Sequence, residues 1–185
     1  MTRPLAIVLT LLVAANLATA QIVTLDLDGH QVRLFDASSS KLVVLIFVRT
    51  DCPIANRYAP EIERLYQAYA SRVAYHLVYP DANESAVAIQ KHISDYRYTV
   101  PALRDPEHVL VKLAKVRVTP EAAIFSARGE LLYHGRIDNR YISFGKARNQ
   151  PTRKDLEETL QTALAGWPIK EAVTPAIGCS LADIK

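Results

Sequence analysis

An apolar run at residues 42–48 most constrains the fold of this chain. The run is rich in β-branched residues and too short for an independent buried helix, so it predicts a strand covered on both faces, as in parallel or mixed sheets. Thr50-Asp51-Cys52-Pro53 follows directly, and apolar residues at helical spacing then predict a helix over residues 53–70. Pro53 suits the first turn of that helix, because the N–H that proline lacks would have no partner there.

Other segments alternate between strand and helix patterns. Residues 22–33 alternate around Asp28-Gly29, which predicts an N-terminal hairpin. Further strands are expected at residues 73–79, 122–125 and 131–133, and further helices at residues 84–94, from Asp105-Pro106 onward, and from a Thr152 cap to Gly166. This order predicts an α/β fold with a central mixed sheet, helices on both faces and an inserted βα element.

The first twenty residues have the layout of a signal peptide. Arg3 precedes an apolar run, and Ala18-Thr19-Ala20 supplies the small residues of a cleavage site before Gln21. An uncleaved membrane anchor is the alternative, for which the run is short. We expect export to the periplasm or secretion, with membrane contact only through residues 1–20 before cleavage. The mature chain then divides into a domain at residues 21–166 and a C-terminal tail at residues 167–185.

Composition excludes several classes of function. Lys and Arg number 22 against 19 Asp and Glu, a surplus too small to indicate nucleic-acid binding. The five histidines lack metal-ligand spacing and there is no glycine-rich phosphate loop, so no metal or other cofactor is expected. His76, within an apolar strand, is interpreted as a core histidine with satisfied hydrogen bonds. In an oxidising compartment the two cysteines, Cys52 and Cys179, are expected to be able to pair.

Cys52 stands between the buried strand and the following helix, and this place predicts reactivity. Unpaired N–H groups and the positive end of the helix dipole both favour thiolate over thiol, and the thiolate is the nucleophile. The alternative is a cysteine that acts only as a small buried apolar residue.

The order of strand, Cys52-Pro53, helix, Val118-Thr119-Pro120 and then strand–turn–strand–helix resembles the thioredoxin fold, over about residues 22–166. Within that fold the chain is most similar to the redoxin group that includes AhpC/TSA peroxiredoxins and TlpA-like secreted thioredoxins. Residues 50–58 resemble the active-site segment of exported bacterial redoxin-domain proteins. The resemblance implies a thioredoxin-like domain with a catalytic Cys52.

The chain departs from each related subfamily near Cys52. Ala55 stands where thioredoxins carry their second cysteine, and Asn56 replaces the second cysteine of Sco-type copper chaperones. Leu45 and Arg49 occupy the proline and threonine positions of the peroxiredoxin motif. Thr50 is one residue closer to Cys52 and is a candidate to donate a hydrogen bond to the sulfur or to a bound oxygen.

Val118-Thr119-Pro120 resembles the cis-proline loop that faces the nucleophile in thioredoxin-fold proteins. The resemblance implies a cis Pro120 and a Thr119 backbone that pairs with an extended substrate chain near Pro53; an ordinary trans proline is the alternative. Glu121 resembles the Pro-Glu of cytochrome-c-maturation thioredoxins. Desolvation beside a sheet core would suit Glu121 to carry a proton, whereas a surface glutamate would need no role.

Cys179 lies in the tail, 127 positions after Cys52. In a mobile tail it is a candidate resolving cysteine for a sulfenic acid or a mixed disulfide at Cys52. The alternatives are a permanent crosslink, which would stabilise the fold by about 4–5 kcal/mol, and a bond to another chain.

These observations predict an exported thiol oxidoreductase that performs thiol–disulfide exchange or peroxide reduction. Its substrate would be a protein thiol or disulfide, or a small hydroperoxide. Two rivals remain from the sequence: a non-catalytic binding module with a structural Cys52–Cys179 disulfide, and a Sco-like metallochaperone.

Overall fold

A computed structural model describes residues 22–35 and 42–182 of the chain. The expected signal peptide at residues 1–20 lies outside the described residues. Within the described ranges, none of the helices combines the length and the apolar character that crossing a membrane requires.

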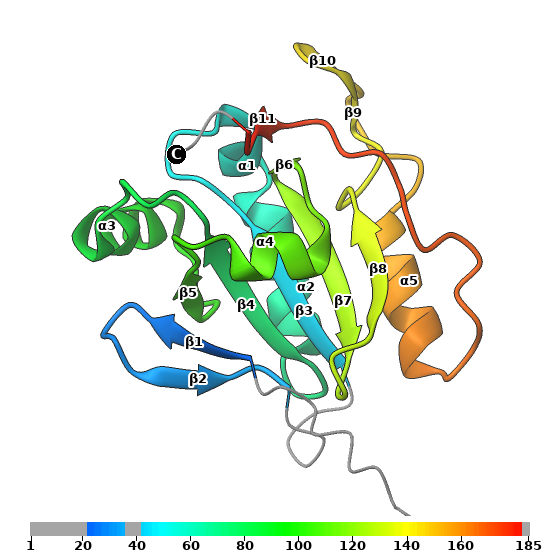
Figure 1. Ribbon diagram of the computed structural model, residues 1–185. Helices are drawn as coiled ribbons and strands as arrows, with labels where there is room; N and C mark the ends of the chain where they lie inside the picture. Colours follow the sequence, from blue (N-terminus) through cyan, green and yellow to red (C-terminus); the bar gives the residue numbers. More distant parts are fainter. Residues whose placement is uncertain (1–21, 36–41, 183–185) are drawn as a thin grey trace, which may run out of the picture.

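One seven-stranded sheet forms the centre of the domain, in the order β2-β1-β5-β4-β3-β7-β8 (Figure 1). Its strands are β1 (Val23–Asp26), β2 (Gln31–Arg33), β3 (Leu42–Phe47), β4 (Ala74–Tyr79), β5 (Ala102–Arg104), β7 (Glu121–Ser126) and β8 (Leu131–Gly135). The pairs β3–β4 and β4–β5 are parallel and the others are antiparallel. The sheet is therefore mixed, and β1 with β2 forms the expected hairpin.

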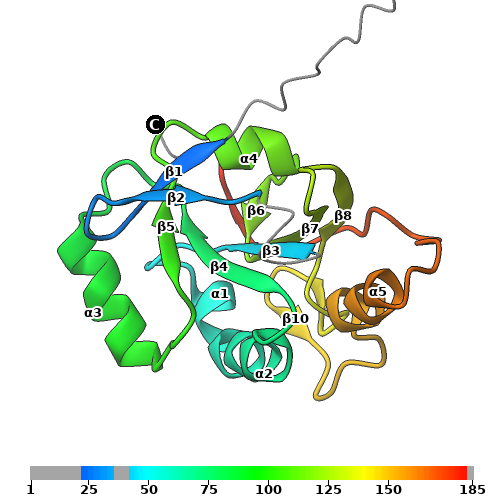
Figure 2. The ribbon, with the colours of Figure 1, turned by 90° about the horizontal axis from the view of Figure 1, so that it is seen from below.

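Helices cover both faces of the sheet, as the apolar run in β3 predicts (Figure 2). One face packs against α1 (Pro53–Arg57), α2 (Ala59–Tyr69), α3 (Ala86–Tyr96) and α5 (Asp155–Leu164), and the other against α4 (Val109–Ala114). Side chains of β3 alternate between the two layers, with Val44 and Ile46 on the first face and Val43 and Leu45 on the second. The element β5–α4 is the βα element between α3 and β7. The α/β, thioredoxin-like fold expected from the sequence is confirmed.

The single helix expected over residues 53–70 is wrong, because the chain breaks at Tyr58 between α1 and α2. Pro60 explains the break: it has no N–H for the carbonyl of Asn56, and its ring would crowd that carbonyl in a continuous helix. The turn is fixed by Tyr58 Oη, which donates to Asp138 Oδ1 at 2.5 Å. Asp138 is buried at 3% exposure, so this contact ties the helix junction to the loop after β8.

Two boundary predictions for α5 had different outcomes. The Thr152 cap is wrong, because α5 begins at Asp155 with Lys154 at the capping position. Thr152 Oγ1 instead accepts a hydrogen bond from Asn139 Nδ2 at 2.8 Å. Gly166 ends the helix as expected, with the positive φ of 73° that glycine adopts without strain.

Several short strands could not be predicted from the sequence pattern. β5 has three residues, directly after Pro101, and is stabilised by its place between β1 and β4. β6 (Val118–Thr119) pairs with β11 (Cys179–Ser180), and β9 (Tyr141–Ser143) pairs with β10 (Lys146–Ala147). Strands of two or three residues have no readable alternation, so their partners alone define them.

His76 is expected to make the fold sensitive to acid. It lies in β4 opposite Leu45. Its Nδ1 is buried and has no hydrogen-bond partner among the described residues. The expectation that the hydrogen bonds of His76 are satisfied is therefore wrong. Burial lowers the pKa of His76 to about 4 from its ordinary 6.5. As the pH falls, the His76 imidazole therefore binds a proton in the unfolded chain before it does so in the folded protein. Proton binding then favours unfolding, and the free energy of unfolding decreases between pH 6.5 and pH 4.

We expect the free energy of unfolding to fall by about 2 kcal/mol more in the wild type than in His76→Leu, between about pH 7 and about pH 4.5. Urea unfolding of both proteins, kept oxidised, measures this difference. Other buried acids titrate in both proteins and cancel in the comparison. Equal losses in the two proteins would show that His76 does not carry the effect.

Candidate functional site

Cys52 caps the helix that follows β3. Its backbone is extended, with φ −85° and ψ 108°, and Pro53 is the first residue of α1. The amide of Ala55 donates a hydrogen bond to Cys52 Sγ at 3.5 Å. The sulfur thus lies at a helix N-terminus, where backbone amides stabilise negative charge.

Cys52 and Cys179 are joined by an intramolecular disulfide, with their Cα atoms 6.0 Å apart. The two sulfurs come from very different surroundings. Cys52 has 0% exposure within the main apolar core, whereas Cys179 is half-buried and lies in the tail. Pairing of the two cysteines is confirmed.

The tail brings Cys179 to Cys52 by adding a short strand to the proline loop (Figure 1). β11 pairs antiparallel with β6, so that Cys179 lies opposite Thr119. The Thr119–Pro120 bond is cis, as expected, and the carbonyl oxygen of Thr119 lies 3.0 Å from Cys52 Sγ. The backbone edge of Thr119, expected to bind a substrate chain, is therefore occupied by the protein's own tail.

Gly178 permits the close approach of these two backbones. A Cβ at this position would overlap the carbonyl oxygen of Thr119 and would lie 3.2 Å from the nitrogen of Pro120. Both are backbone atoms of a buried loop and cannot turn aside as a side chain does. Glycine is thus required sterically immediately before Cys179.

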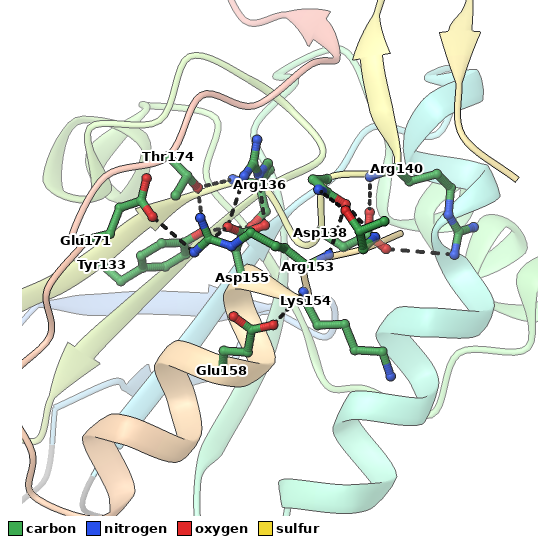
Figure 3. A network of polar contacts seen from close by, with 12 residues as sticks. Tyr133, Arg136, Asp138, Arg140, Arg153, Lys154, Asp155, Glu158, Glu171 and Thr174 are labelled. Carbon is green, nitrogen blue, oxygen red and sulfur yellow. Dashed lines mark hydrogen bonds and ion pairs between the residues drawn. The ribbon is translucent and has the colours of Figure 1, made fainter. Parts of the chain in front are cut away.

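The tail is also docked before Gly178, against β8 and against Arg153 just before α5 (Figure 3). Thr174 is 3% exposed, its Oγ1 lies 2.6 Å from Tyr133 Oη, and its amide donates to the carbonyl of His134 at 3.2 Å. Glu171 pairs with Arg153 at 3.0 Å. These contacts fix the path of the tail along the edge of the sheet.

The tail is held beyond Cys179 as well. The amide of Leu181 donates to the carbonyl of Arg117 at 2.9 Å, and Leu181 is 6% exposed in the apolar layer beneath α4. Arg49 Nη1 donates to the carbonyl of Ser180 at 3.4 Å. The tail of the disulfide form is therefore anchored on both sides of Cys179, unlike the mobile tail expected from the sequence.

Thr50 positions the loop before Cys52 through its backbone. Its amide donates to Glu84 Oε1 at 2.7 Å, and its carbonyl accepts from Asn56 Nδ2 at 3.1 Å. Glu84 is 9% exposed, and burial raises the pKa of its carboxyl although the hydrogen bond from Thr50 opposes this shift. Nothing in the sequence pattern marked Glu84, since only the fold brings the loop after β4 beneath Thr50.

Glu121 stabilises the proline loop through hydrogen bonds from its buried side. Its Oε2 accepts from the amides of Arg117 at 2.8 Å and Val118 at 3.3 Å, and its Oε1 lies 3.1 Å from His134 Nδ1. Glu121 is 5% exposed, so it is not the surface glutamate of the alternative reading. These bonds link β6, β7 and β8 on the side where the tail docks.

Within the described ranges, one group of three side chains could share a metal ion: Asp26, Asp28 and His30, on the β1–β2 turn. This exposed group is separate from the two cysteines. The cysteine sulfurs are bonded to each other. Asn56, which stands at the position of the second cysteine of Sco-type chaperones, has its Oδ1 2.8 Å from His92 Nε2.

Comparison with known proteins gives a family match and a distant relative. A profile of the AhpC/TSA family matches residues 14–134. Thiol-disulfide oxidoreductase ResA of Halalkalibacterium halodurans is 26% identical over 107 residues, which make up 58% of this chain and 60% of that protein. The chain thus aligns with less than two thirds of the length of this relative.

Solved structures share the fold. A hypothetical protein from Sinorhizobium meliloti 1021 superposes with a TM-score of 0.74 at 22% identity, covering 88% of this chain and 91% of that one. A secreted disulfide oxidoreductase of Mycobacterium tuberculosis, described as homologous to E. coli DsbE, superposes with a TM-score of 0.53 at 21% identity, over 80% of this chain and 97% of that one.

Proposed function

The chain belongs to the AhpC/TSA family, and from this premise we propose that it is an exported thiol oxidoreductase that exchanges disulfides with protein partners. One observation carries the proposal: the Cys52–Cys179 disulfide joins the N-terminus of α1 to a strand on the cis-Pro120 loop. At a helix N-terminus the thiolate of the reduced cysteine is stabilised, which favours a disulfide that can open and close.

The reaction transfers two electrons. The reduced protein carries two thiols, and a partner disulfide takes two electrons and two protons from them to become two thiols. The protein is left with the Cys52–Cys179 bond. Cys52 is the nucleophile that closes this bond, because the Ala55 amide stabilises its thiolate.

Neighbouring residues position this chemistry. Pro53 begins α1 and so fixes the capping place of Cys52. Thr119 and Pro120 provide the backbone edge along which the second sulfur arrives. We assign Thr50 and Glu121 to positioning, because their hydrogen bonds hold the two loops that meet at the disulfide.

Peroxide reduction is less well supported than disulfide exchange. Leu45 and Arg49 occupy the peroxiredoxin motif positions, and Leu45 is 0% exposed within β3. The guanidinium of Arg49 donates hydrogen bonds to the carboxylate of Asp51 at 2.9 Å and to the carbonyl of Ser180 in the tail. Neither residue supplies a hydroxyl to a peroxide at Cys52.

Export is proposed from the layout of residues 1–20. Export would place the chain in an oxidising compartment, where the Cys52–Cys179 disulfide can form and persist. The partners proposed are protein thiols and disulfides; two proteins to which the chain is similar are described as a thiol-disulfide oxidoreductase and a disulfide oxidoreductase.

Redox titration tests the proposal. In glutathione and dithiothreitol buffers, we expect the Cys52–Cys179 disulfide to have a midpoint above about −300 mV, since stabilisation of the Cys52 thiolate favours the reduced form. Peptide mapping after alkylation measures the bonded fraction. A midpoint well below about −300 mV would show a structural crosslink, the rival function. A Cys52 sulfenic acid formed rapidly with peroxide would instead favour peroxidase activity.

A further inference from the structure

We propose that Cys179, and not Cys52, is the cysteine that bonds to the partner's sulfur. The inference rests on the proposed disulfide exchange and assigns the two sulfurs of that same site. It reverses the order expected from the sequence, in which the partner bonds to Cys52 and Cys179 resolves the bond.

Access is the first reason. Exchange requires a thiolate to approach one sulfur along the S–S axis, from the side away from the sulfur that leaves. Cys52 has 0% exposure, with the Ala55 amide 3.5 Å and the Thr119 carbonyl 3.0 Å from its Sγ. No incoming group can reach its far side while α1 and the proline loop stay folded. Cys179 is half-buried on a two-residue strand, and its neighbours Gly178 and Ser180 are half-buried as well, so this sulfur lies closer to the surface than that of Cys52.

The leaving sulfur is the second reason. Exchange is faster when the sulfur that leaves is the more stable thiolate. Attack on Cys179 expels Cys52, which then receives the Ala55 amide at the start of α1. Attack on Cys52 would expel Cys179, which lies at no helix terminus. Accessibility and thiolate stability therefore select the same sulfur.

A partner thiolate bonds to Cys179 Sγ, the Cys179–Cys52 bond breaks, and its electron pair goes to Cys52 as thiolate. A second partner thiol, once deprotonated, attacks the partner's sulfur in the mixed disulfide and releases Cys179 as thiolate. The partner becomes a disulfide and loses two electrons, which the two cysteines gain. In the opposite direction Cys179 attacks a partner disulfide and Cys52 then closes the internal bond.

The tail suits Cys179 to this role. The segment around it is held by the pairing of β11 with β6, by the Leu181–Arg117 and Arg49–Ser180 hydrogen bonds and by the burial of Leu181. Once the disulfide opens, the covalent restraint is gone, and only these non-covalent contacts and those of Thr174 and Glu171 keep the tail docked. A partner bonded to Cys179 can then move with the tail, while Cys52 keeps its place at α1.

Trapping the first adduct tests the proposal. The oxidised full chain is mixed with excess reduced glutathione, quenched in acid within seconds, alkylated with N-ethylmaleimide in denaturant, and mapped by peptide mass spectrometry. We expect glutathione on Cys179 and N-ethylmaleimide on Cys52, with the adduct on Cys179 at least about tenfold in excess. The same protein oxidised but unfolded in urea is the matched control, in which both sulfurs are accessible and the preference should fall towards unity.

The outcomes separate the two proposals. Adducts mainly on Cys52, or shared equally in the folded protein, overturn the assignment to Cys179 but leave disulfide exchange in place. A disulfide that glutathione opens only in the urea control overturns both, because the bond is then structural.

Discussion

A Cys52→Ser variant is expected to reduce a peptide disulfide at least about a thousandfold more slowly than the wild type, with dithiothreitol as electron donor. The reason is chemical: a serine oxygen cannot form the internal disulfide that completes the exchange. Cys179 stays in place in this variant and can still bond to a partner. When the reduced variant is mixed with the peptide disulfide in the absence of dithiothreitol, we therefore expect a long-lived mixed disulfide on Cys179, visible by mass spectrometry.

Cys179→Ser is the matched control for stability. Either substitution removes the same crosslink, which spans 127 positions. In the chain-entropy treatment that crosslink contributes about 4–5 kcal/mol, so both variants should unfold in urea with the free energy of the reduced wild type. Serine at position 52 can still accept the Ala55 amide as a helix cap. A Cys52→Ser variant that keeps more than about a tenth of wild-type activity would contradict the assigned chemistry.

The part of the site formed by neighbouring residues could be predicted from the sequence. The apolar run of β3, followed by Cys52 and Pro53, determines a strand, a helix start and a sulfur at that start. The cis bond in Val118-Thr119-Pro120 was expected from the resemblance of this segment to the cis-proline loop of thioredoxin-fold proteins, and proline takes the cis form at small cost. In the first case the physical cause acts within a few residues, so the pattern shows it.

The docking of the tail could not be predicted in the same way. Thr174, Gly178 and Leu181 are each held by residues more than 35 positions away in the chain: Tyr133, Thr119 and Arg117. No periodicity marks such contacts, since the tail forms only a two-residue strand. The hydrogen bonds of Glu84 to Thr50 and of Asp138 to Tyr58 could not be predicted either, because a buried acid and an exposed one look alike in a sequence.

The occupied Thr119 edge changes how the fold should be interpreted. The sequence resemblance implied that this backbone pairs with a substrate, and the structure places Cys179 opposite it. The chain thus carries its second sulfur on a strand of its own, in place of the second cysteine that Ala55 and Asn56 do not supply. The effective concentration of Cys179 at Cys52 then depends on how well β11 fits against β6.

Gly178→Ala tests that dependence and is the second change with a large expected effect. The added methyl group would overlap the Thr119 carbonyl, so β11 must move away from β6 and carry Cys179 from Cys52. We expect the equilibrium constant for closing the internal disulfide to fall at least tenfold, which raises the midpoint potential by about 30 mV or more. Titration in glutathione buffers, with alkylation of the free thiols, measures the shift.

Ala182→Ser is the control for this variant, because Ala182 lies on the same tail but is exposed, so its midpoint should match that of the wild type. Urea unfolding of the reduced proteins provides the second measurement. The Cys52–Cys179 bond is absent there, so the loss of stability in Gly178→Ala gives the cost of displacing β11, including any exposure of the buried Leu181. A midpoint equal to the wild type in Gly178→Ala would show that close pairing of the tail with Thr119 does not set the redox equilibrium. The tail would then be a passive linker for Cys179.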